Sequence, residues 1–404
     1  MILENCRREW HVITAEYPPD IGGVGDYSST LARALVEAGD EVHVWCRSSV
    51  NATSMTDLAS NSDRVTVHRE LGAISFSDLR RVSRLIGPAT DCRTLLVQWV
   101  PHAFGYRSMN LGFCWWLLHR SVHYGDRVQI MVHEPYLAFR VSRWKQNVAA
   151  LVHRVMTILL LRAAERVWVS IPEWERCWRP YTFGRRVPFG WLPVPSNIPV
   201  ADSPSHAEAV RRRYAVNDAV LIGHFGTYGW PVSSVLEPVL LALDGDPANQ
   251  VVLLMGIGSE GFRERLIRKM PRLVRLVQAT GVLSAEDLSH HVAACDLLIQ
   301  PYPDGVSSRR TSVMVGLCHG KPIITTAGSL TEPFWKETSA LALVPVGDVK
   351  AFVDLLRQLR LDVGERARIG RAARRLYEER FDIAHTITTL RGAASAPQHS
   401  TCAF

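Results

Sequence analysis

The segment from Pro301 to Gly320 holds the densest set of side chains that could bind a phosphorylated ligand. It runs from a predicted strand end into a predicted helix and contains, in consecutive positions, Ser307, Ser308, Arg309, Arg310, Thr311 and Ser312. Free amides at a helix start, hydroxyl groups and guanidinium groups together suit a diphosphate. The alternative is structural, with both arginines paired to acidic side chains and Ser312 acting only as a helix cap. We favour the diphosphate site.

A second candidate is the glycine-rich loop between the first predicted strand and the helix that follows it. Gly22, Gly23 and Gly25 would let the backbone approach an anion or a sugar. An ordinary glycine-rich turn is the alternative. The Gly-x-Gly-x-x-Gly spacing of a dinucleotide site is absent from this loop, which argues against a dehydrogenase.

A third candidate is His133, followed by Glu134, at the end of an apolar predicted strand. Gln98 and His102 end another strand and are expected to line the same wall, because the carboxyl ends of parallel strands share one edge of a sheet. A histidine at a strand end can instead be a hydrogen-bonded core residue, and this alternative stays open.

Composition excludes several classes of protein. With 404 residues, 47% apolar and 21% charged, the chain is neither a disulfide miniprotein, a fibrous repeat nor a disordered chain. The net charge of +7 permits an anionic partner without selecting one. The eight cysteines show no Cys-x-x-Cys or zinc spacing, so we expect reduced thiols and no metal. The first eight residues lack the apolar core of a signal peptide, and arginines interrupt the apolar helix near 151–164, so we expect a cytoplasmic protein.

Short apolar runs alternate with helical patterns along the chain, which predicts α/β architecture with parallel sheets. In the first half we expect strands at 11–14, 41–46, 65–69, 94–98, 128–133 and 166–170, with helices at 28–38, 112–121 and 143–164. A proline-rich stretch from Val187 to Ser205 is the best linker candidate. After it we expect strands at 219–225, 250–255, 274–279, 296–300, 322–326 and 340–345, with helices at 232–243, 261–270, 285–294, 312–320, 349–359 and 364–380. Two such domains place a ligand cleft between them.

Several segments together resemble a GT-B fold glycosyltransferase of the large family-four class. They are Tyr17 to Ser28, Leu161 to Ser170, Gly281 to Leu288, Ala294 to Pro301, Gly320 to Thr326 and Val344 to Asp348. Their order and spacing are specific, and the resemblance covers nearly the whole chain. It implies two Rossmann-like domains facing a central cleft, with the boundaries 1–190 for the acceptor domain, 191–204 for the linker and 205–375 for the donor domain. It also implies a last helix over 376–391 that crosses back to the first domain, followed by a flexible tail over 392–404.

The resemblance implies roles for individual residues and requires no metal or other cofactor. Gly22, Gly23 and Gly25 would face the donor, together with Gly226, Thr227, Val282, Leu283 and the run from Ser307 to Ser312. His133 would lie beside the transferred sugar, with Glu134 as a weaker catalytic candidate. The acceptor would contact Tyr27, Gln98, His102 and Asn110.

The chain departs from the family pattern at two places. The usual pair of glutamates falls on Ser307 and Val315, and neither is acidic. The usual arginine and lysine are missing from Gly223 to Trp230. Arg309, Arg310 and Thr311 are the expected substitutes, because a departing diphosphate needs cationic or amide stabilisation.

We therefore expect transfer of a sugar from a nucleoside-diphosphate sugar to a hydroxyl-bearing acceptor, with retention of configuration. The alternatives are a non-catalytic sugar-nucleotide-binding protein and a GT-B fold epimerase. The acceptor is a small molecule, a glycan or a lipid-linked molecule, and no nucleic acid is expected. Ten of the twelve tryptophans lie in the first 191 residues, which favours an aromatic or lipid-like acceptor. Met109 to His123, with Phe113, Trp115, Trp116 and His119, offers an acceptor wall, a peripheral membrane contact or ordinary packing.

Overall fold

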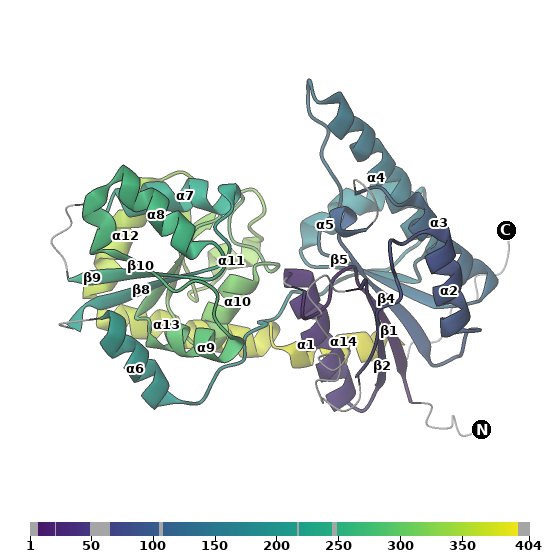
Figure 1. The fold of residues 1–404 in the computed structure, drawn as a ribbon, viewed down its shortest axis with the longest axis horizontal. Coiled ribbons are helices and arrows are strands. Elements are labelled where there is room, and N and C mark those ends of the chain that lie inside the picture. Colours follow the sequence, from purple (N-terminus) through teal and green to yellow (C-terminus); the bar gives the residue numbers. More distant parts are fainter. Residues whose placement is uncertain are drawn as a thin grey trace. The chain divides into compact units, whose positions relative to one another are not determined.

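A computed structural model describes residues 7–20, 22–48, 65–104, 108–215, 218–244 and 249–394. The chain forms two compact units, of which the first ends at Pro193 and includes the chain again from Ile383, while the second spans Val194–Asp382. Figure 1 shows each unit as a sheet with helices on its faces. The expected tail at 392–404 falls almost wholly outside the described residues, as do residues 1–6 of the amino terminus.

The first unit contains a seven-stranded parallel sheet in the order β3-β2-β1-β4-β5-β6-β7. The strands are β1 (Glu9–Ile13), β2 (Glu41–Trp45), β3 (Val65–His68), β4 (Arg93–Trp99), β5 (Arg127–Val132), β6 (Arg166–Val169) and β7 (Phe189–Trp191). The helices are α1 (Gly23–Glu37), α2 (Phe76–Ile86), α3 (Leu111–His123), α4 (Trp144–Ala163), α5 (Pro172–Trp178) and α14 (Ile383–Ala394). Strand β4 is buried along its whole length, as expected of a central parallel strand. Strand β7 lies inside the proline-rich stretch expected to be a linker.

The second unit contains a six-stranded parallel sheet in the order β10-β9-β8-β11-β12-β13. Its strands are β8 (Val220–Phe225), β9 (Gln250–Met255), β10 (Val277–Ala279), β11 (Leu297–Gln300), β12 (Ile323–Ala327) and β13 (Ala342–Pro345). Its helices are α6 (Pro204–Tyr214), α7 (Trp230–Leu241), α8 (Ser259–Lys269), α9 (Ala285–Ala294), α10 (Thr311–Cys318), α11 (Pro333–Glu337), α12 (Val349–Leu361) and α13 (Val363–Arg380). In each sheet the chain first adds strands on one side of its first strand and then continues on the other side. This change of side falls between β1 and β4 in the first sheet and between β8 and β11 in the second. Loops at such a switch point are where open α/β sheets bind ligands.

Helix α14 belongs to the first unit and packs beside α1. Its Leu390 is fully buried, and Arg391 lies 3.3 Å from the Asp40 carboxylate. Asp40 also accepts a hydrogen bond of 3.0 Å from the indole of Trp10 on β1. Helix α14 is therefore tied through Asp40 to strand β1 of the first sheet.

A charged network is buried where β4, α3 and β5 meet. The Asp126 carboxylate lies 2.8 Å from Nη2 of Arg93 and 2.5 Å from Nε of Arg120. The three side chains are at most 3% exposed. Arg93 and Arg120 also donate to the backbone carbonyls of Ile86 and Gly87 at the end of α2. One carboxylate thus lies between two buried cations, and these cations hold the end of α2.

Most tryptophans of the first unit are core residues, which weakens the inference of an aromatic acceptor. Trp10, Trp45, Trp99 and Trp178 are fully buried. In the part of the chain that the structure describes, Cys46, Cys114, Cys177, Cys295 and Cys318 have free thiols. Within the described residues, no helix has both the length and the apolar character needed to cross a bilayer.

Candidate functional site

Four loops of the second unit gather at the carboxyl edge of its sheet. They follow β8, β9, β10 and β11, which are neighbours in the sheet. The amide of Gly226 donates to the carbonyl of Met255 (3.1 Å), and that of Gly256 donates to the carbonyl of Gly281 (3.0 Å). The side chain of Gln300 donates to the carbonyl of Phe225 (3.1 Å). The structure therefore places the predicted donor residues along one edge of the sheet. Gly226, Thr227, Val282, Leu283 and the run from Ser307 to Arg310 lie on its loops, and Thr311 and Ser312 begin helix α10.

The loop after β9 was missed by the sequence reasoning although its spacing was visible. Gly256, Gly258 and Gly261 have the Gly-x-Gly-x-x-Gly spacing between a strand and a helix, the context that this motif requires. Gly256 (φ +112°) and Gly258 (φ +82°) occupy the backbone region that favours glycine. The buried Ser259 hydroxyl accepts a hydrogen bond of 3.0 Å from the amide of Gly281. The central loop of the edge is thus a glycine turn that opens helix α8.

A buried carboxylate holds the serine run in place. Glu332 is 7% exposed and accepts hydrogen bonds from the Ser308 amide (3.0 Å), the Ser308 hydroxyl and the Trp335 indole (2.9 Å). Burial raises the pKa of Glu332. Ser307 and Ser308 are fully buried. Ser308 therefore helps to position the loop that precedes α10, while the expected role of Ser307 and Ser308 as phosphate ligands stays a prediction.

The two arginines of this loop share one acidic partner. Nη2 of Arg309 lies 2.6 Å from Asp304, and Arg310 pairs with the other oxygen of the same carboxylate. The Arg310 guanidinium also lies 4.5 Å from the centre of the Tyr302 ring, and the Tyr302 hydroxyl hydrogen-bonds Ser312 (2.6 Å). Two cations and one anion leave a net charge of +1 at the start of α10. The acidic pairing that we considered as an alternative is therefore present.

The position on which the resemblance places the second glutamate lies in the protein interior. Val315 is fully buried in α10. By contrast, Trp230 at the start of α7 is 80% exposed and Val282 is 66% exposed. The stretch from Gly223 to Trp230, where the resemblance places an arginine and a lysine, therefore ends in an exposed indole ring.

In the first unit, His133 lies with two of the predicted acceptor residues. Its Nε2 is 2.8 Å from Oε1 of Gln98, and its ring meets that of Tyr27 edge-on at 5.0 Å between centroids. All three side chains are buried. Burial lowers the pKa of His133 to about 4, so the imidazole is neutral near pH 7. Among the described residues, the Tyr27 hydroxyl and the Gln98 amide nitrogen find no hydrogen-bond partner, although buried polar atoms normally have one.

Of the other residues predicted in the first unit, His102 and Glu134 form a pair, and Asn110 caps a helix. Nδ1 of His102 is 3.3 Å from the Glu134 carboxylate, and the hydrogen bond between them raises the pKa of His102. Both side chains are exposed to solvent. Asn110 instead caps α3, since its side chain accepts from the Phe113 amide (2.7 Å) and donates to the Ile74 carbonyl (3.3 Å). These bonds leave Asn110 a structural role as a helix cap.

The start of α1, where the sequence predicts an anion, is occupied by a side chain of the protein. Oε1 of Glu16 accepts from the amides of Val24 and Gly25, each at 3.2 Å. A Cβ at position 22 would overlap the Glu16 carboxylate, so a residue larger than Gly22 would have to displace that side chain. An anionic group does lie on the helix N-terminus, as its dipole favours, but a donor phosphate would have to displace it.

One hollow of the second unit lies away from these loops. It has a volume of about 1260 Å³ and is lined by residues at the amino ends of β8 and β9, among them Arg213, Ala219 and Gln250. The glycine turns and the arginine pair lie at the opposite edge of that sheet. We therefore assign the hollow no role in the chemistry.

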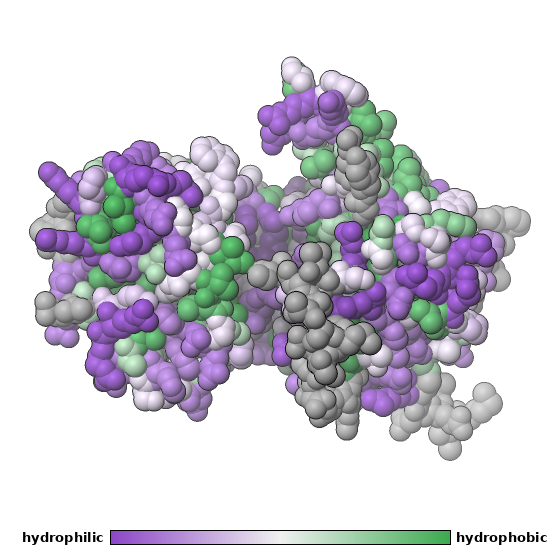
Figure 2. Space-filling model, viewed as in Figure 1, coloured by the Kyte–Doolittle hydropathy of each residue, from purple (hydrophilic) through white to green (hydrophobic). Residues whose placement is uncertain are grey.

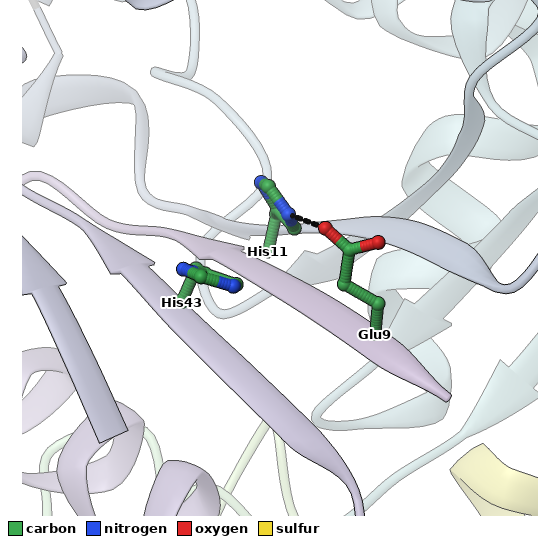
Figure 3. Close-up of side chains that lie close together, drawn as sticks. All are labelled: Glu9, His11 and His43. Carbon is green, nitrogen blue, oxygen red and sulfur yellow. Dashed lines mark hydrogen bonds and ion pairs between the residues drawn. The ribbon is translucent and has the colours of Figure 1, made fainter. Parts of the chain in front are cut away.

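One group of potential metal ligands occurs in the described residues, formed by Glu9, His11 and His43 (Figure 3). The Trp45 indole donates to Nδ1 of His11 (2.9 Å), so Nε2 carries the hydrogen and donates to Glu9 (2.6 Å). Burial lowers the pKa of His11 to about 4. Both ring nitrogens of His11 are therefore engaged, and neither has a lone pair available for a metal. We assign the group no metal.

Buried neutral histidines predict a loss of stability in mild acid. Burial lowers the pKa of His133 to about 4 and that of His224 to about 3, while an unfolded histidine titrates near 6.5. Between pH 6.5 and about 4 the unfolded state therefore binds protons that the folded state does not. The free energy of unfolding should fall by about 1.4 kcal/mol per pH unit for each such histidine. Urea denaturation at pH 7, 6 and 5 measures this slope, and His224→Gln should make it shallower. An equal slope in the variant would contradict the assignment.

Comparison with known proteins identifies the fold. No family model and no curated protein sequence matches the chain. Among solved structures, Anabaena HepE in complex with UDP and glucose is similar, with a TM-score of 0.69, 16% identity and coverage of 95% of this chain and 99% of that one. Sucrose-phosphate synthase from Thermosynechococcus elongatus gives a TM-score of 0.72 at 17% identity, with 96% and 99% coverage. WaaG, a glycosyltransferase involved in lipopolysaccharide biosynthesis, gives 0.61 at 14%, with 96% and 100% coverage. The chain therefore has the GT-B fold, which confirms the predicted fold class.

Proposed function

We propose that this chain, which has the GT-B fold, is a glycosyltransferase that uses a nucleoside-diphosphate sugar. The observation that carries the proposal is the set of four loops at the switch-point edge of the second unit, where glycine turns adjoin the Arg309 and Arg310 pair. Backbone amides and guanidinium groups at such an edge suit a diphosphate. The similar HepE has been solved with UDP and with UDP-glucose, which supports a UDP-sugar as the first donor to test.

In the proposed reaction, the bond between the anomeric carbon and the diphosphate oxygen breaks, and a bond to the acceptor oxygen forms. The acceptor hydroxyl loses its proton, and the nucleoside diphosphate leaves with the bonding electrons. The net positive charge of the Arg309, Arg310 and Asp304 cluster stabilises the departing diphosphate. The family resemblance supports retention of configuration and the absence of any cofactor besides the donor.

The first unit supplies the acceptor side of the proposal. Neutral His133 is held by Gln98 and can hydrogen-bond a sugar hydroxyl without adding charge. The buried Tyr27 hydroxyl and Gln98 amide offer unused hydrogen-bonding capacity beside it. His102 and Glu134 form an exposed acid-base pair that can accept the proton lost by the acceptor hydroxyl.

Donor binding tests the proposal directly. A panel of nucleoside-diphosphate sugars, with UDP-glucose first, should include one that raises the melting temperature of the chain. The double variant Arg309→Ala/Arg310→Ala should weaken binding of that donor by about 10- to 100-fold in calorimetry, since hydrogen bonds to charged groups contribute about 1.5–3 kcal/mol. Arg212→Ala is the matched control, because this arginine lies on α6 in an exposed pair with Glu208. Unchanged donor affinity in the double variant would mean that Arg309 and Arg310 do not contribute to donor binding.

A non-catalytic sugar-nucleotide-binding protein is the alternative that one observation favours. The position of the usual ribose-binding glutamate is the buried Val315, so one part of the family's machinery is absent. Slow release of nucleoside diphosphate from the bound donor in the absence of acceptor would support a transferase. Tight donor binding without any release, with or without a panel of acceptors, would support the binding protein.

A further inference from the structure

Large apolar side chains are exposed along a short stretch of the first unit. Seven of the 21 exposed large apolar side chains in the described residues lie between positions 137 and 155. Before α4, Phe139 is 54% exposed and Val141 is 95% exposed, and Trp144 at the helix start is 71% exposed. We call the segment Leu137–Lys145 the tip. Figure 1 shows that it projects with the start of α4 beyond the rest of the first unit.

Helix α4 extends the apolar surface away from the tip. Trp144, Val148, Leu151 and Val155 are all exposed and have the i, i+4, i+7, i+11 spacing of one helix face. We call these four residues the stripe. The other face of the helix is buried and includes Ala150, His153, Met156 and Leu160. Helix α4 is therefore apolar on both faces, and Figure 2 shows hydrophobic surface along it and its neighbour α3.

The tip is held in a defined shape by its own hydrogen bonds. The side chain of Asn147 accepts from the Arg140 amide (2.8 Å) and donates to the Arg140 carbonyl (3.0 Å). Gln146 donates to the Ala138 carbonyl (3.2 Å). Arg154 lies 3.9 Å from the centre of the Phe139 ring and donates to the Leu137 carbonyl (3.1 Å). Hydrogen bonds from polar side chains to the backbone thus hold the tip in a conformation that leaves its apolar side chains exposed.

The charge of this surface is entirely positive. From Pro135 to Ala164 the sequence contains no Asp or Glu, whereas the tip itself contains Arg140, Arg143 and Lys145. Within the described residues, no carboxylate forms an ion pair with any of these three cations. Lys145 lies 5.7 Å from the centre of the Trp144 ring, so charge and aromatic surface are adjacent.

We propose that the tip and the stripe bind the surface of an anionic lipid bilayer. Tryptophan and phenylalanine suit the interface between headgroups and acyl chains, and three unpaired cations suit anionic headgroups. A second copy of the chain fits less well, because a two-fold contact through this face would bring like cations together. The surface differs from the one expected at Met109–His123, where Phe113 and Trp116 are buried and Trp115 is exposed.

Vesicle co-sedimentation of the full chain tests the proposal. The protein should bind vesicles of phosphatidylcholine mixed with phosphatidylglycerol at about 0.1 M salt. Binding should fall for phosphatidylcholine alone and at about 1 M salt, where the Debye length is about 3 Å. The triple variant Arg140→Ser/Arg143→Ser/Lys145→Ser should partition on the order of 100-fold less, at about fivefold for each cation. Val141→Ser/Trp144→Ser should also reduce binding, whereas Phe76→Ser, at an exposed aromatic on α2 of the same unit, should bind like the unchanged protein.

Melting temperatures equal to that of the unchanged chain establish that these surface variants are folded. Absence of vesicle binding, equal binding to neutral and anionic vesicles, or full binding by the triple variant would overturn the proposal. Sedimentation velocity adds one further outcome. A dimer that Val141→Ser/Trp144→Ser abolishes, without vesicle binding by the unchanged protein, would assign the surface to a second copy instead. Donor binding by the second unit is measured separately, so either proposal can fail alone.

Discussion

Replacing Asp126 by alanine is expected to lower the free energy of unfolding by about 3–5 kcal/mol. The substitution leaves Arg93 and Arg120 buried without a counter-charge, and both guanidinium groups are almost inaccessible to water. Burial already lowers the pKa of Arg120, which shows the cost of holding this cation away from solvent. Urea denaturation followed by tryptophan fluorescence measures the effect, because ten of the twelve tryptophans lie in the first 191 residues.

Two further variants test whether the loss of stability in Asp126→Ala comes from the buried network or from the loss of any one carboxylate. Asp354→Ala removes an exposed carboxylate that pairs with Lys350 on α12, so it should change stability far less. Replacing all three buried residues by apolar ones, as Arg93→Met/Arg120→Met/Asp126→Leu, should recover much of the stability lost in Asp126→Ala. If Asp126→Ala were no more destabilising than Asp354→Ala, the Asp126 carboxylate would not be the group that stabilises the two buried arginines.

Replacing Gly256 by alanine is expected to damage both the stability and the donor site of the second unit. Gly256 has φ +112°, which costs a residue with a side chain about 1–3 kcal/mol. A Cβ here would also overlap the backbone carbonyl oxygen of Gly226, which cannot rotate away as a side chain can. The loops after β8 and β9 would have to separate. We therefore expect donor affinity to fall more than tenfold in calorimetry, together with a lower melting temperature.

Gly39 provides a matched control for this prediction. It has φ +94°, but no atom lies within 4 Å of the position of an added Cβ. Gly39→Ala should therefore show the backbone strain alone and leave donor affinity unchanged. Equal donor affinity in the two variants would mean that the contact between Gly256 and Gly226 does not shape the donor site.

The sequence pattern was sufficient for the fold class because parallel α/β units have strong periodicity. The apolar runs at 94–98 and 128–133 were predicted as strands and correspond to β4 and β5. Helix α2 was missed, although Ser75 and Asp78 form a capping box at its start. Helix α6 was also missed, since none of its residues is buried and it has no apolar face to detect. Apolar periodicity in the sequence reveals a helix or a strand only when the burial of its side chains follows the same period.

The candidate site was less predictable, because its partners come from distant positions. Glu332 contacts Ser308 across 24 residues of sequence, and no local pattern connects the two. Asp304 is only five residues from Arg309, and their pairing was anticipated as the structural alternative. Glu16 lies beside the glycine loop, yet its position on the α1 amides depends on the course of the backbone. The sequence indicated which segments carry chemistry, and the structure shows which of their groups are already engaged.

The place of α14 has a consequence for how the chain folds as it is synthesised. The first unit is discontinuous, because residues from Ile383 onward complete it after the whole second unit has been translated. Helix α1 packs against α14 in the finished protein, but it leaves the ribosome long before α14 is made. Until then Leu390 does not cover it, and Asp40 lacks its contact with Arg391. The second unit is continuous in sequence and can close first. The amino-terminal unit is thus the first to be made and the last to be finished, and a nascent chain released before Ile383 would expose an incompletely covered face to chaperones and proteases.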